Sequence, residues 1–455
     1  MSGAGPREEG NPDSQPEVTE RREKIKTLIT LLAACFVGTA IAQQPAANQT
    51  GEKTLIAAPA RAQDETQSAG PKVRAITTFV RIDREHYRAQ LLNAANMLRG
   101  ARTRFQKDGW EVEFMRITTQ PFPEYVNGLS HDQALSFLME MDALAEKEDF
   151  LLAIGPAMSR DRDDPAMMDL LGELLSKARV INATALIAGE DGIYWKVVRA
   201  AARMVKHIED HSPESQGNFS FTAAAMMPEY APFYPASYHT GPGHCFSVGL
   251  ESANVVDRAF AETAGDPDAA SRRLKADLAQ YTSLAEASAM AVAKESGWEY
   301  LGLDPTPAPL MDVSIGVAIE RFTGHRFGSS GTLTAARLIT EAVKAVPARQ
   351  VGYSGLMLPV LEDRRLAQRW SEGTINIDSL LAYSAVCATG LDTVPLPGDI
   401  SEEQIARILG DVGSLACKWK KALTARLLPV KGKKAGERSQ FHDPYLENAV
   451  LQPLP

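Results

Sequence analysis

Alternation between apolar strands and amphipathic helices is the feature that most constrains how this chain can fold. Val73–Val80, VRAITTFV, has the composition of a strand, and residues 84–109 after it have the apolar spacing of a helix that ends at a glycine. A second strand, a helix opened by a capping box at Ser130 and the wholly apolar strand FLLAIGPA come next. The pattern continues to about Val430 and predicts an α/β fold of mainly parallel strands with right-handed crossovers. About nine to ten strands are too many for a compact open sheet, so we expect a closed barrel surrounded by helices.

The middle of the chain departs from this alternation. Residues 218–252 are rich in proline and predict two strands, Phe219–Met227 and His244–Glu251, joined by a long loop. Long loops with aromatic content are usually functional. An alanine-rich helical stretch follows, and Val351–Asp363 predicts a buried strand that runs into a helix.

The residues before Val73 have a different composition. The basic patch RREKIK, the apolar run TLITLLAACFVGTAIA and the small residues at 40–42 are typical of a cleaved secretory signal. We therefore expect residues 1–42 to be removed and the protein to be periplasmic or otherwise exported. The apolar run is short for a bilayer, which leaves no stable membrane span after processing. The alternatives are an uncleaved anchor, or a lipoprotein anchored through Cys35 of the box LAAC.

The remaining chain divides into three parts by composition. Residues 43–72 are rich in Ala, Gln and Pro and predict a flexible linker. Residues 73–437 predict a single α/β barrel domain, and 438–455 an irregular tail.

Charge, motifs and cysteine content exclude several classes of function. The net charge is −9 with no basic stripe among aromatic residues, which argues against nucleic acid as a partner. The chain has no G-x-G-x-x-G after its first strand and no Walker loop, which argues against these nucleotide-binding modes. Beyond the leader lie Cys245, Cys387 and Cys417, and an odd number argues against a disulfide framework. A small-molecule ligand is the partner class that remains, in a monomer or a homo-oligomer.

Acidic residues gather where the predicted strands end. The set is Glu251, Asp304, Glu362, Asp363, Asp392 and Asp399. Loops at the carboxyl ends of parallel strands converge in this fold class, so these carboxylates could hold a divalent cation or divide into an acid and a base. Glu362, Asp363 and Asp399 have a structural alternative, because each begins a helix, where capping or the helix dipole favours an acid. Asp304 and Asp392 lack that alternative and are the leading catalytic candidates.

The stretch YHTGPGHCFS offers a second set of candidates, His239, His244 and Cys245. Their spacing is not a standard zinc pattern, although zinc stays an alternative. His244 suits a general base because its unperturbed pKa is about 6.5, and the alternative is a histidine hydrogen-bonded in a turn. Cys245 would need a base oriented toward it to act as a nucleophile.

Three arginines, Arg74, Arg81 and Arg116, lie on or beside the early strands. An arginine that points into a barrel can bind a carboxylate substrate, whereas one on the rim is solvated. The sequence leaves both possibilities open.

Four stretches together carry a family resemblance: VRAITTFV, GLDPTPAPLMDVSIGVAIERFTG, GYSGLMLPVLED and CATGLDTVPLPGD, followed by RLLPVKGKKAGE. In order and spacing they resemble the bacterial family called domain of unknown function seven hundred eleven, over about Val73–Glu437. The resemblance implies a barrel similar to that of pyruvate formate-lyase and no assigned chemistry. Glycyl-radical enzymes of that fold class place a glycine and a cysteine on opposing loops.

The radical-glycine motif is matched only in part. Arg349, Gly352 and Tyr353 fit it, whereas Gln350 and Val351 depart from it, and the motif lies far from residue 455. We therefore expect Gly352 to be a relic of a radical site, or a small residue where the backbone passes close to a neighbour.

These observations lead to three function hypotheses. The first is an enzyme of hydrolase or lyase type that acts on a small polar metabolite at a carboxylate-rich pocket, with Asp304, Asp392 and His244 as catalytic groups. The second is a periplasmic binding protein without turnover, and the third a non-catalytic descendant of a glycyl-radical-type barrel. The cofactor stays unknown, with a divalent cation as the candidate.

Overall fold

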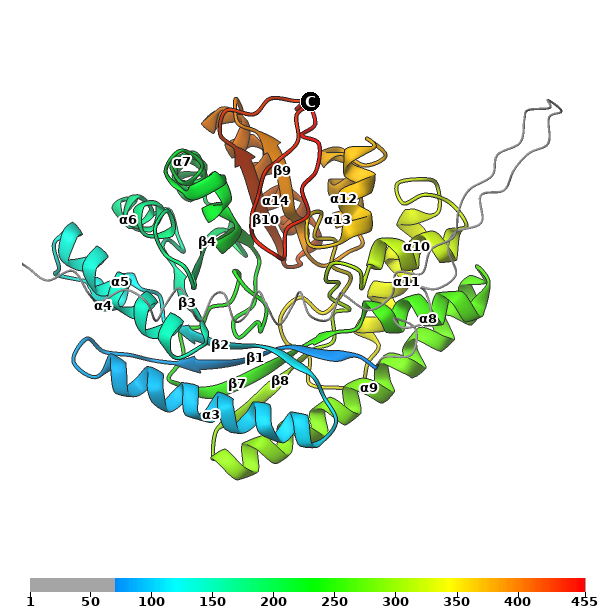
Figure 1. Ribbon diagram of the computed structural model, residues 1–455, viewed down its shortest axis with the longest axis horizontal. Helices are drawn as coiled ribbons and strands as arrows, with labels where there is room; N and C mark the ends of the chain where they lie inside the picture. The colour runs from blue at the N-terminus through cyan, green and yellow to red at the C-terminus, as the bar shows by residue number, and fades with distance from the viewer. Residues whose placement is uncertain (1–69, 455) are drawn as a thin grey trace, which may run out of the picture. The chain divides into compact units, whose positions relative to one another are not determined.

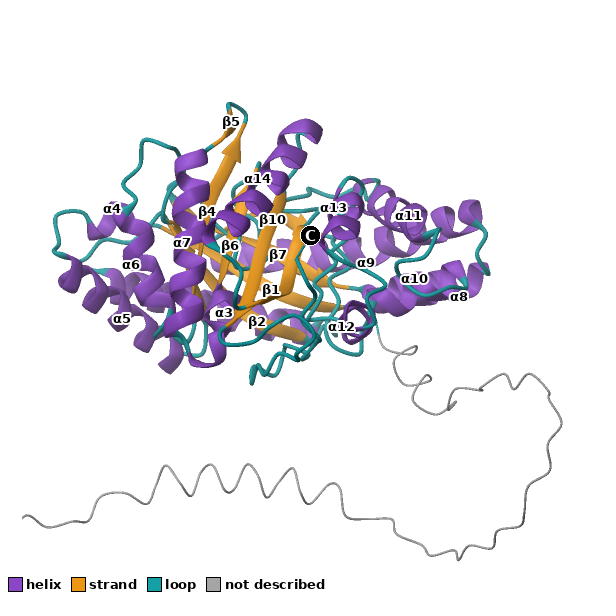
Figure 2. Ribbon diagram, turned by 90° about the horizontal axis from the view of Figure 1, so that it is seen from above, coloured by secondary structure: helices purple, strands orange, loops and turns teal. Residues whose placement is uncertain are grey.

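The strands of the computed structural model form one sheet whose order does not follow the sequence (Figures 1 and 2). The structure describes residues 70–454. The order is β8-β7-β1-β2-β3-β4-β6-β10-β9, with the short β5 paired to β4. The strands are β1 Lys72–Val80, β2 Val112–Thr119, β3 Leu151–Pro156, β4 Ile181–Gly189, β5 Gly192–Ile193, β6 Phe221–Ala225, β7 Gly243–Glu251, β8 Glu299–Asp304, β9 Gly390–Pro397 and β10 Leu423–Val430.

Helices cover the outside of this sheet, and Figure 1 shows the strands wrapping around a centre that loop segments occupy. Helix α3 packs on β1 and β2, α7 on β4, and α14 on β10. The helices are α3 Tyr87–Lys107, α4 Pro123–Val126, α5 His131–Lys147, α6 Ala166–Leu175, α7 Trp195–His211, η1 Pro213–Ser220, α8 Ala253–Thr263, α9 Pro267–Ser296, α10 Ile315–Thr323, α11 Thr332–Lys344, α12 Arg364–Ser371, α13 Ile377–Ser384 and α14 Glu402–Trp419.

The sheet is mainly parallel, as the sequence predicts, but two of its long strands meet their neighbours antiparallel, as does the short β5. Strands β1, β2, β3, β4 and β6 are parallel neighbours. Strand β7 pairs antiparallel with β1, and β10 pairs antiparallel with β6. The pairs β7–β8 and β9–β10 therefore run against the central five strands. As a result, the carboxyl end of β7 lies beside the amino end of β1, with Glu251 opposite Lys72.

The segment 349–361 joins the two edges of the sheet. At its start, Leu303 of β8 exchanges backbone hydrogen bonds with Arg349 and Val351, at 2.9 and 3.1 Å. At its end, the amide of Val360 donates to the carbonyl of Asp392 in β9 at 2.9 Å. The regular strand predicted here is instead a chain of isolated bridges, because glycines and prolines interrupt the ladder. Strands and segment together surround the central space.

The predicted C-terminal tail contacts the domain, whereas the predicted N-terminal segments lie outside the described residues. The tail 438–454 packs on the domain, with Phe441, Leu446, Ala449 and Leu451 buried. The predictions for residues 1–42, including lipidation of Cys35, and for the linker up to residue 69 lie outside the described residues. No helix within residues 70–454 is long and apolar enough to cross a bilayer.

Candidate functional site

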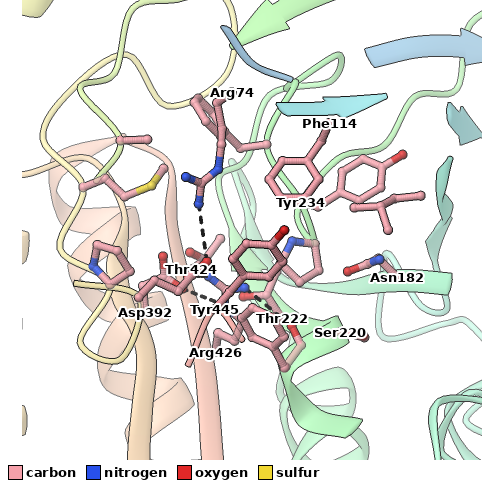
Figure 3. A pocket seen from close by; sticks show the side chains of 18 of the residues that line it. Arg74, Phe114, Asn182, Ser220, Thr222, Tyr234, Asp392, Thr424, Arg426 and Tyr445 are labelled. Carbon is pink, nitrogen blue, oxygen red and sulfur yellow. Dashed lines mark hydrogen bonds and ion pairs between the residues drawn. The ribbon is translucent and has the colours of Figure 1, made fainter. Parts of the chain in front are cut away.

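A cavity of about 280 Å³ lies at the amino ends of the central strands. Arg74, Phe114 and Asn182, which line it, are the second or third residues of β1, β2 and β4. The sequence predicts a site at the carboxyl ends of the strands, and this holds only for β7 and β8. These two strands run opposite to the central ones, so Glu251 and the loop after Asp304 lie at this same end of the sheet. Figure 3 shows that Arg74, Asn182, Arg426 and Tyr445, from distant parts of the chain, gather around this cavity.

An alternating chain of arginines and carboxylates, all of which except Glu251 line the cavity, runs along one wall. The Arg74 Nη1 atom lies 2.5 Å from the Glu251 carboxylate, and its Nη2 atom 3.6 Å from Glu362. Arg426 contacts Glu362 through Nη2 and Asp392 through Nε, the latter at 2.7 Å. All five side chains are buried. Because every charged group in this series has an oppositely charged neighbour, ion pairing offsets the cost of removing these groups from water.

Burial and ion pairing act in opposite directions on these groups. Burial raises the pKa of Glu362, and the neighbouring Arg426 opposes the rise. Burial also raises the pKa of Glu251 against the pull of Arg74. For Arg426, burial lowers the pKa, but the carboxylates of Asp392 and Glu362 outweigh it and raise the pKa overall. Glu362 is thus a buried carboxyl that can hold a proton inside the cavity wall.

Arg116 lines the cavity without joining this chain of ion pairs. Its side chain is 7% exposed, and Nη1 donates to the carbonyl of Pro232 at 3.2 Å. Among the described residues, no carboxylate forms an ion pair with it and its buried Nε has no hydrogen-bond partner. The rings of Phe114 and Tyr234 lie over the guanidinium at 5.2 and 4.7 Å from its central carbon. Burial and the charge of Arg74 lower the pKa of Arg116 to about 10.

The long loop between β6 and β7 fills the space behind Arg116. Its Tyr234 hydroxyl donates to the carbonyl of Ile117, and Thr77 Oγ1 donates to the carbonyl of Pro232 at 2.9 Å. Phe233 of the loop packs against Gly249, where a side chain would contact its ring. Phe233 and Tyr234 of this loop therefore help to form the wall of the cavity.

The C-terminal tail forms another part of the wall. Tyr445 and Asp443 line the cavity, and the Tyr445 ring meets Phe114 edge-on at 5.5 Å between ring centres. The tail is held in place by Glu447, whose amide donates to the carbonyl of Leu361 at 2.8 Å. The tail predicted as irregular is thus part of the site.

Of the predicted site residues, Glu362 and Asp392 line the cavity, and Glu251 pairs with Arg74 without being part of the lining. Asp304 does not line the cavity. It lies behind the wall, where its carboxylate accepts hydrogen bonds from the amides of Thr306, Tyr353 and Ser354 at 3.0, 2.7 and 3.1 Å. Burial raises the pKa of Asp304 to about 6. Its position makes it an anchor for the loop that carries Tyr353 into the cavity.

Gly352 belongs to the same loop. Its φ is +72°, and a Cβ atom there would collide with the Asp304 carboxylate. The close backbone approach that the sequence suggested is therefore real, and it explains a glycine without any radical chemistry.

Asp363 and Asp399 lie apart from the cavity. Asp363 caps two helices, because its carboxylate accepts from the amides of Ile315 and Gly316 at the start of α10 and of Arg365 and Leu366 in α12. Asp399 is exposed, and Ser401 caps the following helix instead. Asp363 therefore has the capping role that the sequence offered as an alternative, whereas Asp399 does not cap the helix.

The three residues of the His–Cys stretch do not form a common site. His239 is buried with Nε2 3.1 Å from the carbonyl of Val80. His244 is exposed and stacks on Trp298 at 4.3 Å between ring centres. Burial raises the pKa of Cys245 to about 12, which keeps the thiol protonated. Within residues 70–454 no three His, Cys, Asp or Glu side chains are grouped as a metal ion would need.

Sequence reasoning missed Arg426, Tyr234, Asp443 and Tyr445. Arg426 left a signal, since it is the single charge within the apolar strand LTARLLPV. A charge in the middle of a buried strand must be paired or functional. Asp443 and Tyr445 left none, because they lie in a segment without periodicity.

Comparison with known proteins places the chain in a family. A family model described as Uncharacterised ACR (DUF711) matches residues 66–442, which is most of the chain. The chain belongs to the DUF711 family. A UPF0210 protein of Pyrobaculum islandicum is 30% identical to this DUF711 protein over 347 residues, covering 72% of this chain and 76% of the relative. A UPF0210 protein of Methanocaldococcus jannaschii is 27% identical over 76% of this chain and 80% of the relative.

Solved structures give a distant match. The anaerobic ribonucleotide reductase from Thermotoga maritima, in complex with dATP and CTP, aligns over 85% of this DUF711 chain and 80% of its own, with a TM-score of 0.39 and 9% identity. A match this distant carries no argument about the site. The fold rests on the sheet topology, and the family resemblance seen in the sequence is confirmed by the family model.

Proposed function

We propose that this protein is an enzyme of hydrolase or lyase type whose small polar substrate carries an anionic oxygen group, a carboxylate or a phosphate, bound by Arg116. The observation that carries the proposal is the buried Arg116 guanidinium, which lines the cavity with Nε unpartnered and no ion pair within the described part of the chain.

The energetic argument starts from the cost of burying a charge. A guanidinium removed from water loses several kcal/mol of hydration, which ion pairs and hydrogen bonds must offset. Arg74 and Arg426 have that compensation from Glu251, Glu362 and Asp392. Arg116 has two aromatic faces and one backbone carbonyl. Its remaining N–H donors suit a bound carboxylate or phosphate, which accepts a guanidinium through two parallel hydrogen bonds.

Glu362 and Asp392 would supply the acid–base chemistry. Both line the same cavity as Arg116, and Arg426 holds both carboxylates in place. Burial raises the pKa of the Glu362 carboxyl, which suits it to act as an acid or a base near neutral pH. Positioned proton transfer of this kind supports cleavage or elimination in a small substrate without a nucleotide cofactor.

The first test is a thermal-shift titration of the full chain with inorganic phosphate, acetate and succinate. We expect at least one of them to raise the melting temperature through mass action. The variant Arg116→Met should lose that rise. Without ligand it should gain roughly 1 kcal/mol or more in the free energy of unfolding, because an uncompensated buried charge is removed. Arg81→Met is the control, since Arg81 is outside the cavity lining and its side chain is 41% exposed.

Two results would contradict the proposal. One is that none of the three anions stabilises the protein, and the other is that Arg116→Met responds like the wild type. A ligand-induced rise in melting temperature that is lost in Arg116→Met would establish that Arg116 binds the anion.

Binding without turnover is the second candidate, because Glu362 contacts both Arg74 and Arg426 and is tightly held. The two candidates separate once a stabilising ligand is known. Incubation of that ligand with the full chain, followed by proton NMR, should show conversion that Glu362→Gln abolishes while binding persists. Binding with no conversion in the wild type would favour the second candidate.

A further inference from the structure

We propose that the ligand of this cavity is amphoteric: besides the anionic group at Arg116, it carries a protonated amino group that Asp443 binds. This inference rests on the proposed function and adds the chemical class of the ligand. Small α-amino acids and their derivatives are the simplest molecules of this class.

Asp443 is a cavity-lining carboxylate with little compensation. Its Oδ1 accepts a hydrogen bond from the amide of Tyr445 at 2.9 Å. No Lys, Arg or His among residues 70–454 forms an ion pair with it. Burial raises the pKa of Asp443, with the Tyr445 amide and Arg426 opposing the rise. A cation brought by a ligand would reverse that shift, as any opposite charge does.

Arg426 is the nearby cation, but each of its three nitrogens already has an acceptor. Nε donates to Asp392, Nη2 to Glu362, and Nη1 lies 3.5 Å from the carbonyl of Phe219. Arg179, which also lines the cavity, is held by both oxygens of Glu146 at 2.7 and 3.0 Å. Asp443 therefore forms no ion pair with either of these arginines.

Two charged side chains of the cavity lining lack an ion pair among residues 70–454, the Arg116 guanidinium and the Asp443 carboxylate. A simple anion bound to Arg116 would leave Asp443 without a cation. An amino acid carries both charges, so it can pair with Arg116 and with Asp443 and adds no net charge to a confined site of low dielectric. The amphoteric ligand is therefore preferred.

The Tyr445 ring supports the same assignment. Tyr445 lines the cavity two residues from Asp443 on the same tail, whereas the Phe114 and Tyr234 rings already lie over Arg116. An ammonium group bound by a carboxylate beside a ring face gains both ionic and cation–π attraction.

The experiment compares matched pairs of ligands that differ only in the amino group. The full chain is titrated with glycine and acetate, L-leucine and 4-methylpentanoate, and L-phenylalanine and 3-phenylpropanoate. Dissociation constants come from the thermal shifts. In at least one pair the amino acid should bind on the order of tenfold more tightly, the ratio expected for one charge-assisted hydrogen bond.

Asp443→Asn should bring that ratio to about one and leave binding of the simple acid nearly unchanged, since Arg116 is intact. Asp443→Glu, which keeps the charge, should retain a preference for the amino acid. Asp399→Asn is the matched control, because Asp399 is exposed and lies away from the cavity.

The outcomes separate this inference from the proposed function. If simple acids bind through Arg116 but no amino acid binds more tightly than its partner, the inference fails and the proposed function stands. If the preference survives in Asp443→Asn, or is lost equally in Asp443→Glu, Asp443 is not the amino-group ligand. If neither kind of molecule stabilises the wild type, both proposals fail.

Discussion

At the scale of single residues, Asp304 shows how one buried carboxylate organises a loop. Its oxygens accept from the amides of Thr306, Tyr353 and Ser354, so three backbone donors converge on one side chain. The loop must pass so close that only a glycine fits at 352, where φ is also positive. Asp304 and Gly352 are therefore one structural unit, although the sequence presented them as two unrelated site candidates.

This pairing predicts that Gly352→Ala costs more than backbone strain alone. Alanine in the left-handed region costs about 1–2 kcal/mol, and the clash with Asp304 should add roughly 1–3 kcal/mol. Gly128→Ala is the matched control, because Gly128 has φ +80° with no heavy atom within 4 Å of its added Cβ. Urea unfolding of both variants measures the difference. Equal losses in the two variants would mean that the loop relaxes away from Asp304.

The sequence located part of the candidate site. Acids at strand ends identified Glu362 and Asp392 of the cavity lining, and the early arginines included Arg74 and Arg116. The pattern could not separate these from Asp363, which caps helices instead, because an acid before a helix looks the same in both roles. Asp443 lies in the aperiodic tail, where only tertiary packing decides whether a side chain reaches a cavity.

At the scale of elements, the sequence did not reveal in which direction each strand runs. Hydrophobic periodicity gave the strands and helices, and most were found close to their predicted places. Periodicity is the same for a parallel and an antiparallel neighbour, so the reversals at β7 and β10 could not be seen. Those reversals decide which strand ends meet, and they bring Glu251 to Arg74.

The C-terminal tail is the element whose removal tests the site most directly. Deleting 438–455 removes Asp443 and Tyr445 from the cavity and exposes the surface that Phe441, Leu446, Ala449 and Leu451 cover. Losing several buried apolar side chains at roughly 1.5–3 kcal/mol each should markedly lower the free energy of unfolding. The protein should also lose any ligand-induced thermal shift.

The control for this deletion is a chain that ends at Gln452. Its side chain donates to the carbonyls of Trp370 and Ile375, so the tail stays anchored. Urea unfolding and thermal-shift titration of both chains provide the measurements. A long deletion that keeps wild-type stability and ligand response would show that the tail is not part of the site.

At the scale of the whole molecule, buried acids determine how stability depends on pH. Burial raises the pKa of Glu251, Asp304, Glu362 and Asp363. A group whose pKa is higher in the folded state binds more protons when folded, so its contribution to stability falls as the pH rises. This is opposite to the usual behaviour of salt-bridged carboxylates, whose contribution grows with pH.

Asp304 gives the clearest test, because burial is the first cause of its shift and none of the salt bridges within residues 70–454 includes it. Its pKa is about 6 in the folded protein, against about 3.9 for an exposed aspartate. Relative to Asp304→Asn, which does not titrate, wild-type stability should therefore fall between about pH 4 and pH 7, by at most about 3 kcal/mol. Urea unfolding of both proteins across this range measures the difference, with Asp399→Asn as the exposed control. A difference that stays constant or grows with pH would mean that the surrounding amides stabilise the ionised carboxylate more than burial disfavours it.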